Sequence, residues 1–206
     1  MKKDNQTIWQ IYSIDTGYYL GNDAIKYGYD YIHDDQISWF EKETNFAKGN
    51  AESYLPSVVF GHIGLNEMTE AAEKAKKELQ NADETGNPTG QGTNGYIGGY
   101  YHENNSSSKV HSTFFQSAKT HGVKGIFAGH DHSNDAVFDY EDVILGYGVK
   151  ANTELYYSNI RFGEETMTLT GAALYTLKED RTFDIEHIYI DYNKWSNVKS
   201  WKKESL

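Results

Sequence analysis

Three histidines follow the ends of two short apolar segments in this chain. Val58–Phe60 is followed after one glycine by His62, and residues 125–128 are followed after one glycine by His130 and His132. A glycine at the end of a strand permits a sharp bend, and the next side chain then projects from the carboxyl edge of the sheet. Ligands bind at that edge in open α/β sheets. We therefore expect the three histidines to lie close together.

Three imidazoles at one point suit a transition metal ion such as Mn, Fe or Zn, with a carboxylate or water completing the shell. The chain contains no cysteine, so thiolate ligands and disulfides are excluded. A single Gly-His after a strand is more often structural, whereas two histidines separated by one residue are rarer. The sequence therefore predicts that His62, His130 and His132 are metal ligands.

Polar residues accompany the second pair of histidines. Asp131 lies between them, and Asn134 and Asp135 follow them. Side chains of this kind commonly hydrogen-bond to metal ligands and to the loop that carries them. We expect these three residues to hold the loop rather than to bind metal directly, and we expect His187 to be a core or surface histidine.

Alternating strands and helices must position these residues. The expected strands are 8–15, 58–60 and 124–128, and the expected helices begin at Asp34 and cover 67–80 and 112–121. After His132 the expected elements are strands at 141–146, 155–161, 167–177 and 183–190, followed by a polar tail at 193–206. This order favours one α/β domain over residues 1–206 with a mixed sheet.

A polar segment at 81–109 separates the second and third helices. It is rich in Gly, Asn and Ser, and long loops in compact domains are usually functional or disordered. Because it contains few large apolar residues, little burial offsets the cost of ordering it. We expect 83–109 to be the most mobile internal segment.

Composition limits the function. The formal net charge is −11, which disfavours a nucleic-acid partner because the phosphate backbone would be repelled. No apolar run approaches ~20 residues, so we expect no membrane-spanning helix. The 17 tyrosines leave open a carbohydrate-binding or other interaction domain, although core and surface packing explains them more simply.

The segment Phe127–Asp135 resembles the last motif of the calcineurin-like metallophosphoesterases. It is closest to the branch that writes this motif Gly-His-Asp-His-x-Asn-Asp, which includes Dcr2-like and some purple-acid-phosphatase-related proteins. Residues 58–63 resemble the preceding motif, a strand with one ligand histidine, and 11–17, 28–32 and 36–40 resemble the strand, loop and helix before it. The match runs with gaps from about residue 8 to residue 190.

The resemblance implies the C-terminal portion of an α/β sandwich with mixed sheets. His62 and His130 would bind one metal ion and His132 a second. The family's other ligands are an Asp-x-His pair, an aspartate in a Gly-Asp motif and an Asn-His motif with the catalytic histidine, and all lie upstream of the strand that matches 8–15. This chain contains no Gly-Asp dipeptide and no Asp-x-His. Gly64 stands where the family often has proline, and we expect that difference to matter little.

The implied function is hydrolysis of a phosphate ester by a two-metal centre, of which this chain carries one half, with a missing N-terminal half as a partner. Bound cations would supply the positive charge that an acidic chain lacks. The alternative is a truncated or degenerate relative that binds one metal ion or phosphate without turnover. On either interpretation we expect the chain alone to be inactive, or nearly so, as a phosphatase.

Overall fold

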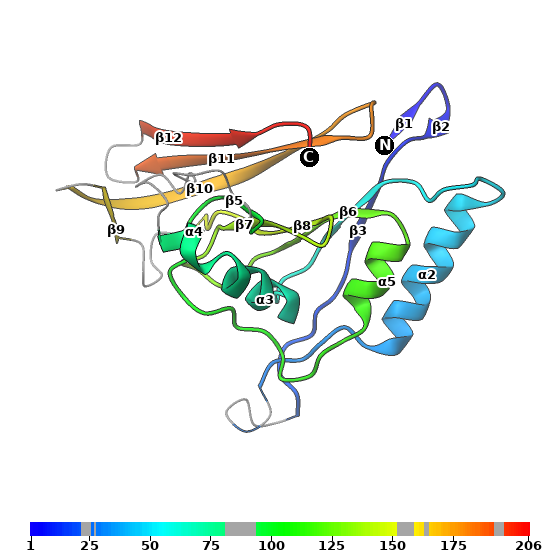
Figure 1. The fold of residues 1–206 in the computed structure, drawn as a ribbon, viewed down its shortest axis with the longest axis horizontal. Helices are drawn as coiled ribbons and strands as arrows, with labels where there is room; N and C mark the ends of the chain where they lie inside the picture. The colour runs from blue at the N-terminus through cyan, green and yellow to red at the C-terminus, as the bar shows by residue number, and fades with distance from the viewer. Residues whose placement is uncertain (22–25, 27, 81–93, 152–158, 163–164, 192–195) are drawn as a thin grey trace.

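The computed structural model describes all of residues 1–206 except 22–25, 27, 81–93, 152–158, 163–164 and 192–195. Its architecture is α/β and has three layers: a four-stranded sheet, a six-stranded sheet and a layer of helices (Figure 1). One hydrophobic core lies between the helices and the six-stranded sheet, and a second lies between the two sheets. The expected α/β fold class with a mixed sheet is confirmed.

The six-stranded sheet carries the expected histidines. Its strand order is β3 (Gln10–Ser13), β4 (Ser57–Phe60), β6 (Val123–Ala128), β8 (Val143–Tyr147), β7 (Val137–Tyr140) and β5 (Tyr96–Gly98). The first four of these strands are parallel, and β7 and β5 are antiparallel to their neighbours. Because parallel strands end at a common edge, the residues that follow β4, β6 and β8 come together there.

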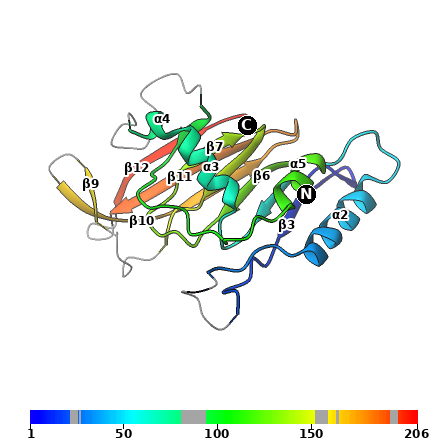
Figure 2. The same ribbon diagram turned by 60° about the horizontal axis from the view of Figure 1, so that its bottom comes forward.

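Helices cover one face of this sheet, as Figure 2 shows with the helical side brought forward. They are α2 (Asp34–Lys48), α3 (Asn66–Lys74), α4 (Lys76–Gln80) and α5 (Phe114–Thr120). Phe40, Met68 and Phe114 are fully buried against the sheet. The helix expected at 67–80 is divided at Ala75 into α3 and α4. No helix in the described part of the chain is long and apolar enough to span a membrane.

The four-stranded sheet is antiparallel, in the order β12 (Ser196–Lys203), β11 (Phe183–Asp191), β10 (Glu165–Leu177) and β9 (Asn159–Phe162). A short hairpin of β1 (Lys2–Lys3) and β2 (Gln6–Thr7) precedes β3. The alternation along β11 places Phe183, Ile185 and Tyr189 in the core between the sheets, where they meet Phe127 and Ile144. These contacts join the two sheets into a sandwich.

The expected polar tail at 193–206 is wrong for Ser196–Lys203, which forms strand β12 beside β11. Trp201 is 5% exposed in the core between the sheets. Trp201 is a large apolar side chain that anchors the end of a strand whose composition is mostly polar. Residues 192–195 lie outside the described part of the chain.

The expected loop at 83–109 divides into two parts. Residues 83–93 lie outside the described part of the chain. The remainder is packed, with Tyr96 and Tyr100 buried. Gly99 adopts a φ of 87°. It lies so close to Asp135 that a Cβ at this position would be 2.2 Å from the Asp135 carbonyl oxygen. A few aromatic residues therefore anchor a segment whose composition is polar.

Candidate metal centre

His62 and His130 lie next to each other at the carboxyl ends of β4 and β6. The two strands are parallel neighbours, and beyond them the N–H of Gly129 donates to the carbonyl of His62 at 3.0 Å. Nδ1 of His130 is 3.3 Å from Nε2 of His62, and the two rings are nearly perpendicular at 78°. One nitrogen of each imidazole therefore faces the other ring at hydrogen-bond distance.

The backbone of His130, whose side chain contacts His62, is in an unusual conformation. Its φ is 64°, in the left-handed region that residues other than glycine rarely adopt. The N–H of Asp131 donates to the carbonyl of Gly129 at 2.7 Å, which closes a three-residue turn around His130. The ring of Tyr29 packs nearly perpendicular to the imidazole, with the ring centroids 4.5 Å apart. Strain of this kind is typical of functional sites.

The separation of the two nitrogens fits metal binding. In a tetrahedral site with metal–nitrogen bonds of about 2.0–2.1 Å, two ligand nitrogens lie about 3.3–3.4 Å apart, which matches the observed 3.3 Å. Burial lowers the pKa of His130, against an opposing effect of Asp131, and His62 and His132 lower it further. This favours the neutral imidazole, which is the form that binds metal.

Two ligands do not make a complete site. Among the described residues there is no group of three or more His, Asp or Glu side chains placed to hold one ion. His132 influences the pKa of His130 but does not form such a group with the pair. Its metal-binding role, which the resemblance assigns to a second ion, stays a prediction.

His62 lines an open groove of about 270 Å³ at the end of β3 and β4. Thr16, which follows β3, shares that groove and is 5% exposed. Its Oγ1 accepts hydrogen bonds from the N–H of His62 at 3.3 Å and of Ile63 at 2.9 Å. The histidine backbone is therefore held from the neighbouring strand while its side chain stays open to the groove.

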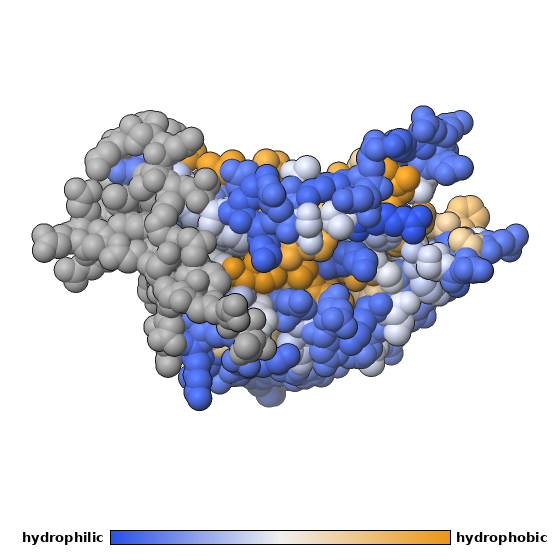
Figure 3. All heavy atoms as spheres, turned by 45° about the horizontal axis from the view of Figure 1, so that its top comes forward, coloured by the Kyte–Doolittle hydropathy of each residue, from blue (hydrophilic) through white to orange (hydrophobic). Residues whose placement is uncertain are grey.

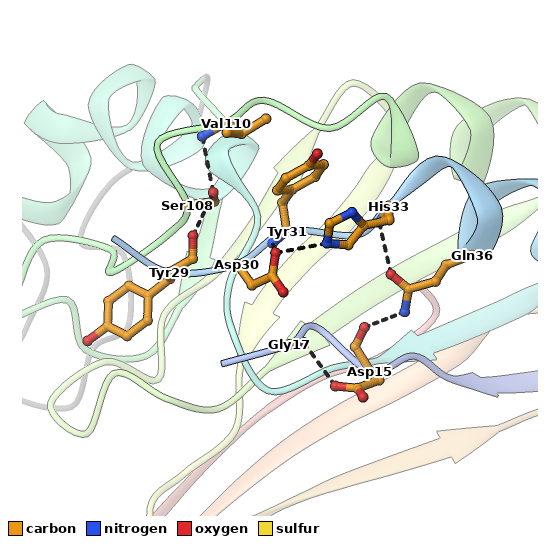
Figure 4. Close-up of polar contacts among 9 residues, drawn as sticks. All are labelled: Asp15, Gly17, Tyr29, Asp30, Tyr31, His33, Gln36, Ser108 and Val110. Carbon is orange, nitrogen blue, oxygen red and sulfur yellow. Dashed lines mark hydrogen bonds and ion pairs between the residues drawn. The ribbon is translucent and has the colours of Figure 1, made fainter. Parts of the chain in front are cut away.

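The loop around Thr16 is braced by polar contacts with the start of α2 (Figure 4). Nε2 of Gln36 donates to the carbonyl of Asp15 at 2.7 Å, and the N–H of His33 donates to Oε1 of Gln36 at 2.9 Å. Nε2 of His33 lies 2.9 Å from Oδ1 of Asp30. The N–H of Gly17 donates to Oδ1 of Asp15 at 2.9 Å. These groups satisfy one another and support the loop.

Asn134 holds the segment 100–106, which directly follows β5 in the chain. Its Oδ1 accepts hydrogen bonds from the N–H groups of His102 at 2.9 Å and Glu103 at 3.1 Å. Its Nδ2 donates to the carbonyl of Glu103 at 2.8 Å. The N–H of Ser133 in turn donates to the Glu103 carboxylate at 2.9 Å. Glu103 thus contacts the histidine loop, and no spacing in the sequence marks it.

Asp131 and Asp135 hold the two ends of the same segment. The carboxylate of Asp131 accepts a hydrogen bond from the N–H of Ser106 at 3.1 Å. The carboxylate of Asp135 accepts one from the N–H of Tyr100, and its own N–H donates to the Tyr100 carbonyl at 2.8 Å. All three polar residues singled out in the sequence therefore bond the segment 100–106. Their hydrogen bonding to metal ligands stays a prediction.

Asp135 also connects the histidine loop to the second sheet. The hydroxyl of Tyr189 on β11 donates to its carboxylate at 2.9 Å, and burial raises the pKa of Asp135 to about 7. Nδ1 of His187 is 3.9 Å away, too far for a hydrogen bond. Burial lowers the pKa of His187 to about 3. Burial therefore favours the neutral form of each group, that of Asp135 below about pH 7 and that of His187 above about pH 3.

Gly64 is closely surrounded by side chains. A Cβ at this position would lie 2.6 Å from Oδ1 of Asn105 and 2.9 Å from the hydroxyl of Tyr147. That hydroxyl donates to Oδ1 of Asn105, while Nδ2 of Asn105 donates to the carbonyl of Leu65 at 2.8 Å. A larger side chain would therefore displace the pair that joins the segment 100–106 to β8. The expectation that the absence of the family's proline matters little stays a prediction.

The fold and the site define a class of protein: an α/β sandwich of two sheets that carries a histidine pair at the carboxyl ends of parallel strands. Comparisons with known proteins agree with this class. The chain is 28% identical over 155 residues to a protein named probable inactive purple acid phosphatase 29. It is 26% identical over 150 residues to one named probable inactive purple acid phosphatase 14. Both relatives are from Arabidopsis thaliana.

These alignments cover 71% and 69% of the chain but only 34% and 32% of the relatives, so the chain spans about a third of the length of the curated relatives it matches. No family model matches it, and the branch suggested by its last motif stays a prediction. The similarities support a phosphoesterase-related family. They do not support catalytic activity, since both relatives are named as inactive.

Proposed function

We propose that this chain carries one half of a metal-dependent phosphoesterase centre and by itself binds a single Mn, Fe or Zn ion without hydrolysing phosphate esters. The observation that carries the proposal is the pair of imidazole nitrogens of His62 and His130, 3.3 Å apart at the ends of adjacent strands. The site described here holds two candidate ligands where a two-metal centre needs several more, including carboxylates.

In this proposal each residue has a defined task. A bound dication would act as a Lewis acid and lower the pKa of bound water. Nε2 of His62 and Nδ1 of His130 would bind the ion. The turn at His130 fixes the direction of its ring, and Thr16 fixes the backbone of His62. The hydrolytic reaction in an intact protein would need the carboxylate ligands and the catalytic histidine from an upstream half.

The non-catalytic alternative is favoured by one observation, the names of both relatives. It differs from the first proposal only in whether an upstream half would restore turnover. A carbohydrate-binding platform has less support, because several tyrosines, including Tyr12, Tyr96, Tyr147 and Tyr189, are buried in the two cores. Tyrosines in the core cannot present a face to a sugar.

The test compares the unchanged chain with His130→Ala and with the control His111→Ala, whose side chain is 57% exposed and faces Glu67 and Glu70. Metal content after dialysis against Mn, Zn or Fe should be about one ion per chain for the unchanged chain and the control. It should be close to zero for His130→Ala. Equal metal content in all three proteins would contradict the proposal.

The same three proteins are then assayed with p-nitrophenyl phosphate and the added metals. We expect no hydrolysis above that of the metal in buffer. Hydrolysis by the unchanged chain that His130→Ala abolishes would show that a complete site exists in this chain. Restoration of hydrolysis on addition of an upstream half that contains the missing motifs would separate the phosphoesterase proposal from the non-catalytic alternative.

A further inference from the structure

A second cavity lies at the edge of the six-stranded sheet opposite to the histidines. Its volume is about 440 Å³, within the roughly 300–1,000 Å³ typical of small-molecule sites. Pro56 immediately precedes β4, and Gly122 and Lys124 lie at the start of β6. Because β4 and β6 are parallel and the histidines follow their ends, the length of these strands separates the cavity from the candidate metal centre.

The lining of this cavity is basic although the chain is acidic. The chain has 30 Asp and Glu residues against 19 Lys and Arg. The described residues that line the cavity nevertheless include Lys119, Lys124 and Arg181 and no carboxylate. A concave surface that carries one sign of charge attracts ions of the opposite sign. The cavity is therefore suited to an anion, even though the net charge of the whole chain repels one.

Three donors in the lining are available to a ligand. Within the described part of the chain, the side chains of Lys124, Arg181 and Ser53 form no ion pair and no hydrogen bond, and all three residues are exposed. Lys119 differs from them, because its ammonium group lies 3.0 Å from the carboxylate of Glu141. Two cations and one hydroxyl in the cavity are thus solvated by water, which an oxyanion can replace.

Arg181 reaches the cavity from the second sheet, on the turn between β10 and β11. The N–H of Lys178 donates to the carbonyl of Thr182 at 2.9 Å, and the N–H of Arg181 donates to the carbonyl of Lys178 at 3.3 Å. The hydroxyl of Thr182 donates to Oδ1 of Asp180 at 2.7 Å. These bonds fix the turn, so the arginine is held opposite Lys124 of β6. A guanidinium group can bind two oxygens of one phosphate at once.

Helix α5 ends at this cavity, and its last carbonyl groups are already bonded. The hydroxyl of Thr120 lies 3.0 Å from the carbonyl of Gln116 and 2.9 Å from that of Ser117. The N–H of His121 donates to the carbonyls of Ser117 at 3.0 Å and Ala118 at 3.2 Å. The partial negative charge of a helix C-terminus resides on carbonyls without donors. These bonds therefore reduce the repulsion that the helix end exerts on an anion.

We propose that this cavity binds a phosphate group, either inorganic phosphate or the phosphate of a small ester. The guanidinium group of Arg181 binds two of its oxygens, and the ammonium group of Lys124 and the hydroxyl of Ser53 bind the others. The charge of a phosphate dianion matches the two unpaired cations. The site is independent of the proposed function, because no residue of the candidate metal centre takes part in it.

The test measures binding of inorganic phosphate and of glycerol phosphate by isothermal titration calorimetry at low ionic strength in EDTA. The variants are Arg181→Gln and Lys124→Gln. The control is Lys76→Gln, which removes the same charge from an exposed lysine outside the cavity that pairs with Glu73 at 3.2 Å. Loss of one charge-assisted hydrogen bond should weaken binding about tenfold or more in each cavity variant. The control should stay close to the unchanged chain.

His130→Ala separates this inference from the proposed function. Its phosphate affinity in EDTA should equal that of the unchanged chain, whatever its metal content. Loss of phosphate binding in His130→Ala would overturn the inference and assign the anion to the histidine edge. Binding of glycerol phosphate as tight as that of inorganic phosphate would identify an ester as the ligand, whereas binding of inorganic phosphate alone would identify free phosphate.

Two further results would overturn the inference. They are no measurable phosphate binding by the unchanged chain, and equal affinities in the unchanged chain and both cavity variants. Arg181→Lys keeps the charge but lacks the paired donors of a guanidinium group, so we expect an affinity between those of the unchanged chain and Arg181→Gln. Unchanged circular dichroism and thermal midpoints of these variants show that a loss of binding is not a loss of folding.

Discussion

At the scale of single residues, His130 combines a strained backbone with an aimed side chain. Its φ of 64° costs an ordinary residue about 1–2 kcal/mol relative to the right-handed region. The same conformation brings its Nδ1 to 3.3 Å from His62. Stability has therefore been given up at the residue that shapes the site, which is the expected pattern for a functional position.

The positive φ of His130 predicts the order of stability of two variants at this position. His130→Gly should be more stable than His130→Ala by about 1 kcal/mol, because glycine adopts a positive φ without the steric penalty of a Cβ. Neither should bind metal. Chemical denaturation of both variants measures the difference in the free energy of unfolding.

The matched control for this pair is position 111. His111 does not have a positive φ, so His111→Gly should be no more stable than His111→Ala. If His130→Gly were the less stable variant at position 130, the strain assigned to His130 would be wrong.

At the scale of elements, the segment 100–106 and strand β12 each owe their place to a few side chains. Asn134 satisfies three backbone groups of the segment. Trp201 inserts between the sheets, where its ring lies 4.5 Å from that of His187 and 3.2 Å from a Cβ built on Gly98. Thus β12 is packed against β5 of the opposite sheet.

Trp201→Ala should therefore destabilise the whole protein. Truncation of a buried tryptophan to alanine costs about 3–5 kcal/mol, a large part of the roughly 5–15 kcal/mol that holds a typical domain together. The midpoint of urea denaturation, compared with that of the unchanged chain, measures the effect.

The control is Lys202→Ala, one residue along β12. Lys202 is exposed and pairs with Glu204 at 2.6 Å, and exposed ion pairs contribute about 0–1 kcal/mol. A Trp201→Ala protein as stable as Lys202→Ala would mean that 196–203 does behave as a tail.

At the scale of the whole molecule, two buried ionisable groups connect the sheets and make stability depend on pH. Burial raises the pKa of Asp135 to about 7, so its neutral form is favoured in the folded state. The contribution of Asp135 to the free energy of unfolding is therefore fully present below the unfolded pKa of about 3.9. It is lost as pH rises toward 7. Burial lowers the pKa of His187 to about 3, so its contribution is present above about 6.5 and is lost as pH falls. Between about pH 4 and 6.5 a rise in pH therefore lowers stability through Asp135 and raises it through His187, so the two effects oppose each other.

Asp135→Asn should isolate the first slope. An amide can still accept the hydrogen bond from Tyr100, but it cannot ionise. The variant should gain stability relative to the unchanged chain as pH rises from about 4 to 7, by up to on the order of 4 kcal/mol for a shift of about three pKa units. Urea denaturation at several pH values measures this difference.

Asp139→Asn, which changes an exposed carboxylate on β7, controls for the general effect of removing one negative charge from an acidic chain. A difference between Asp135→Asn and the unchanged chain that does not vary between pH 4 and 7 would show that Asp135 is not perturbed.

The surface around these cores is largely hydrophilic on the face drawn in Figure 3, with apolar patches between the polar residues.

The sequence by itself was sufficient for the elements with strong local patterns. Helix α2 was placed by Asp34 at its start and by the apolar positions that follow it, and β4 and β6 by their apolar runs ending at glycine. Because both strands end in Gly-His, the histidines that follow them were expected to meet at one edge of the sheet, and His62 and His130 do. The physical reason is that backbone propensity and the periodicity of apolar residues are local properties of the chain.

Only the tertiary structure decided the rest. The roles of Glu103, Gly64 and Trp201 depend on partners that are distant in the chain, from Ser133, 30 residues after Glu103, to Gly98, 103 residues before Trp201. No periodicity reports such partners, so a polar segment and a polar tail became a packed segment and a strand. Which nitrogen of each imidazole faces the other was likewise set by the turn at His130 and by the register of β4 and β6. These features are products of packing between distant segments, which a local pattern cannot encode.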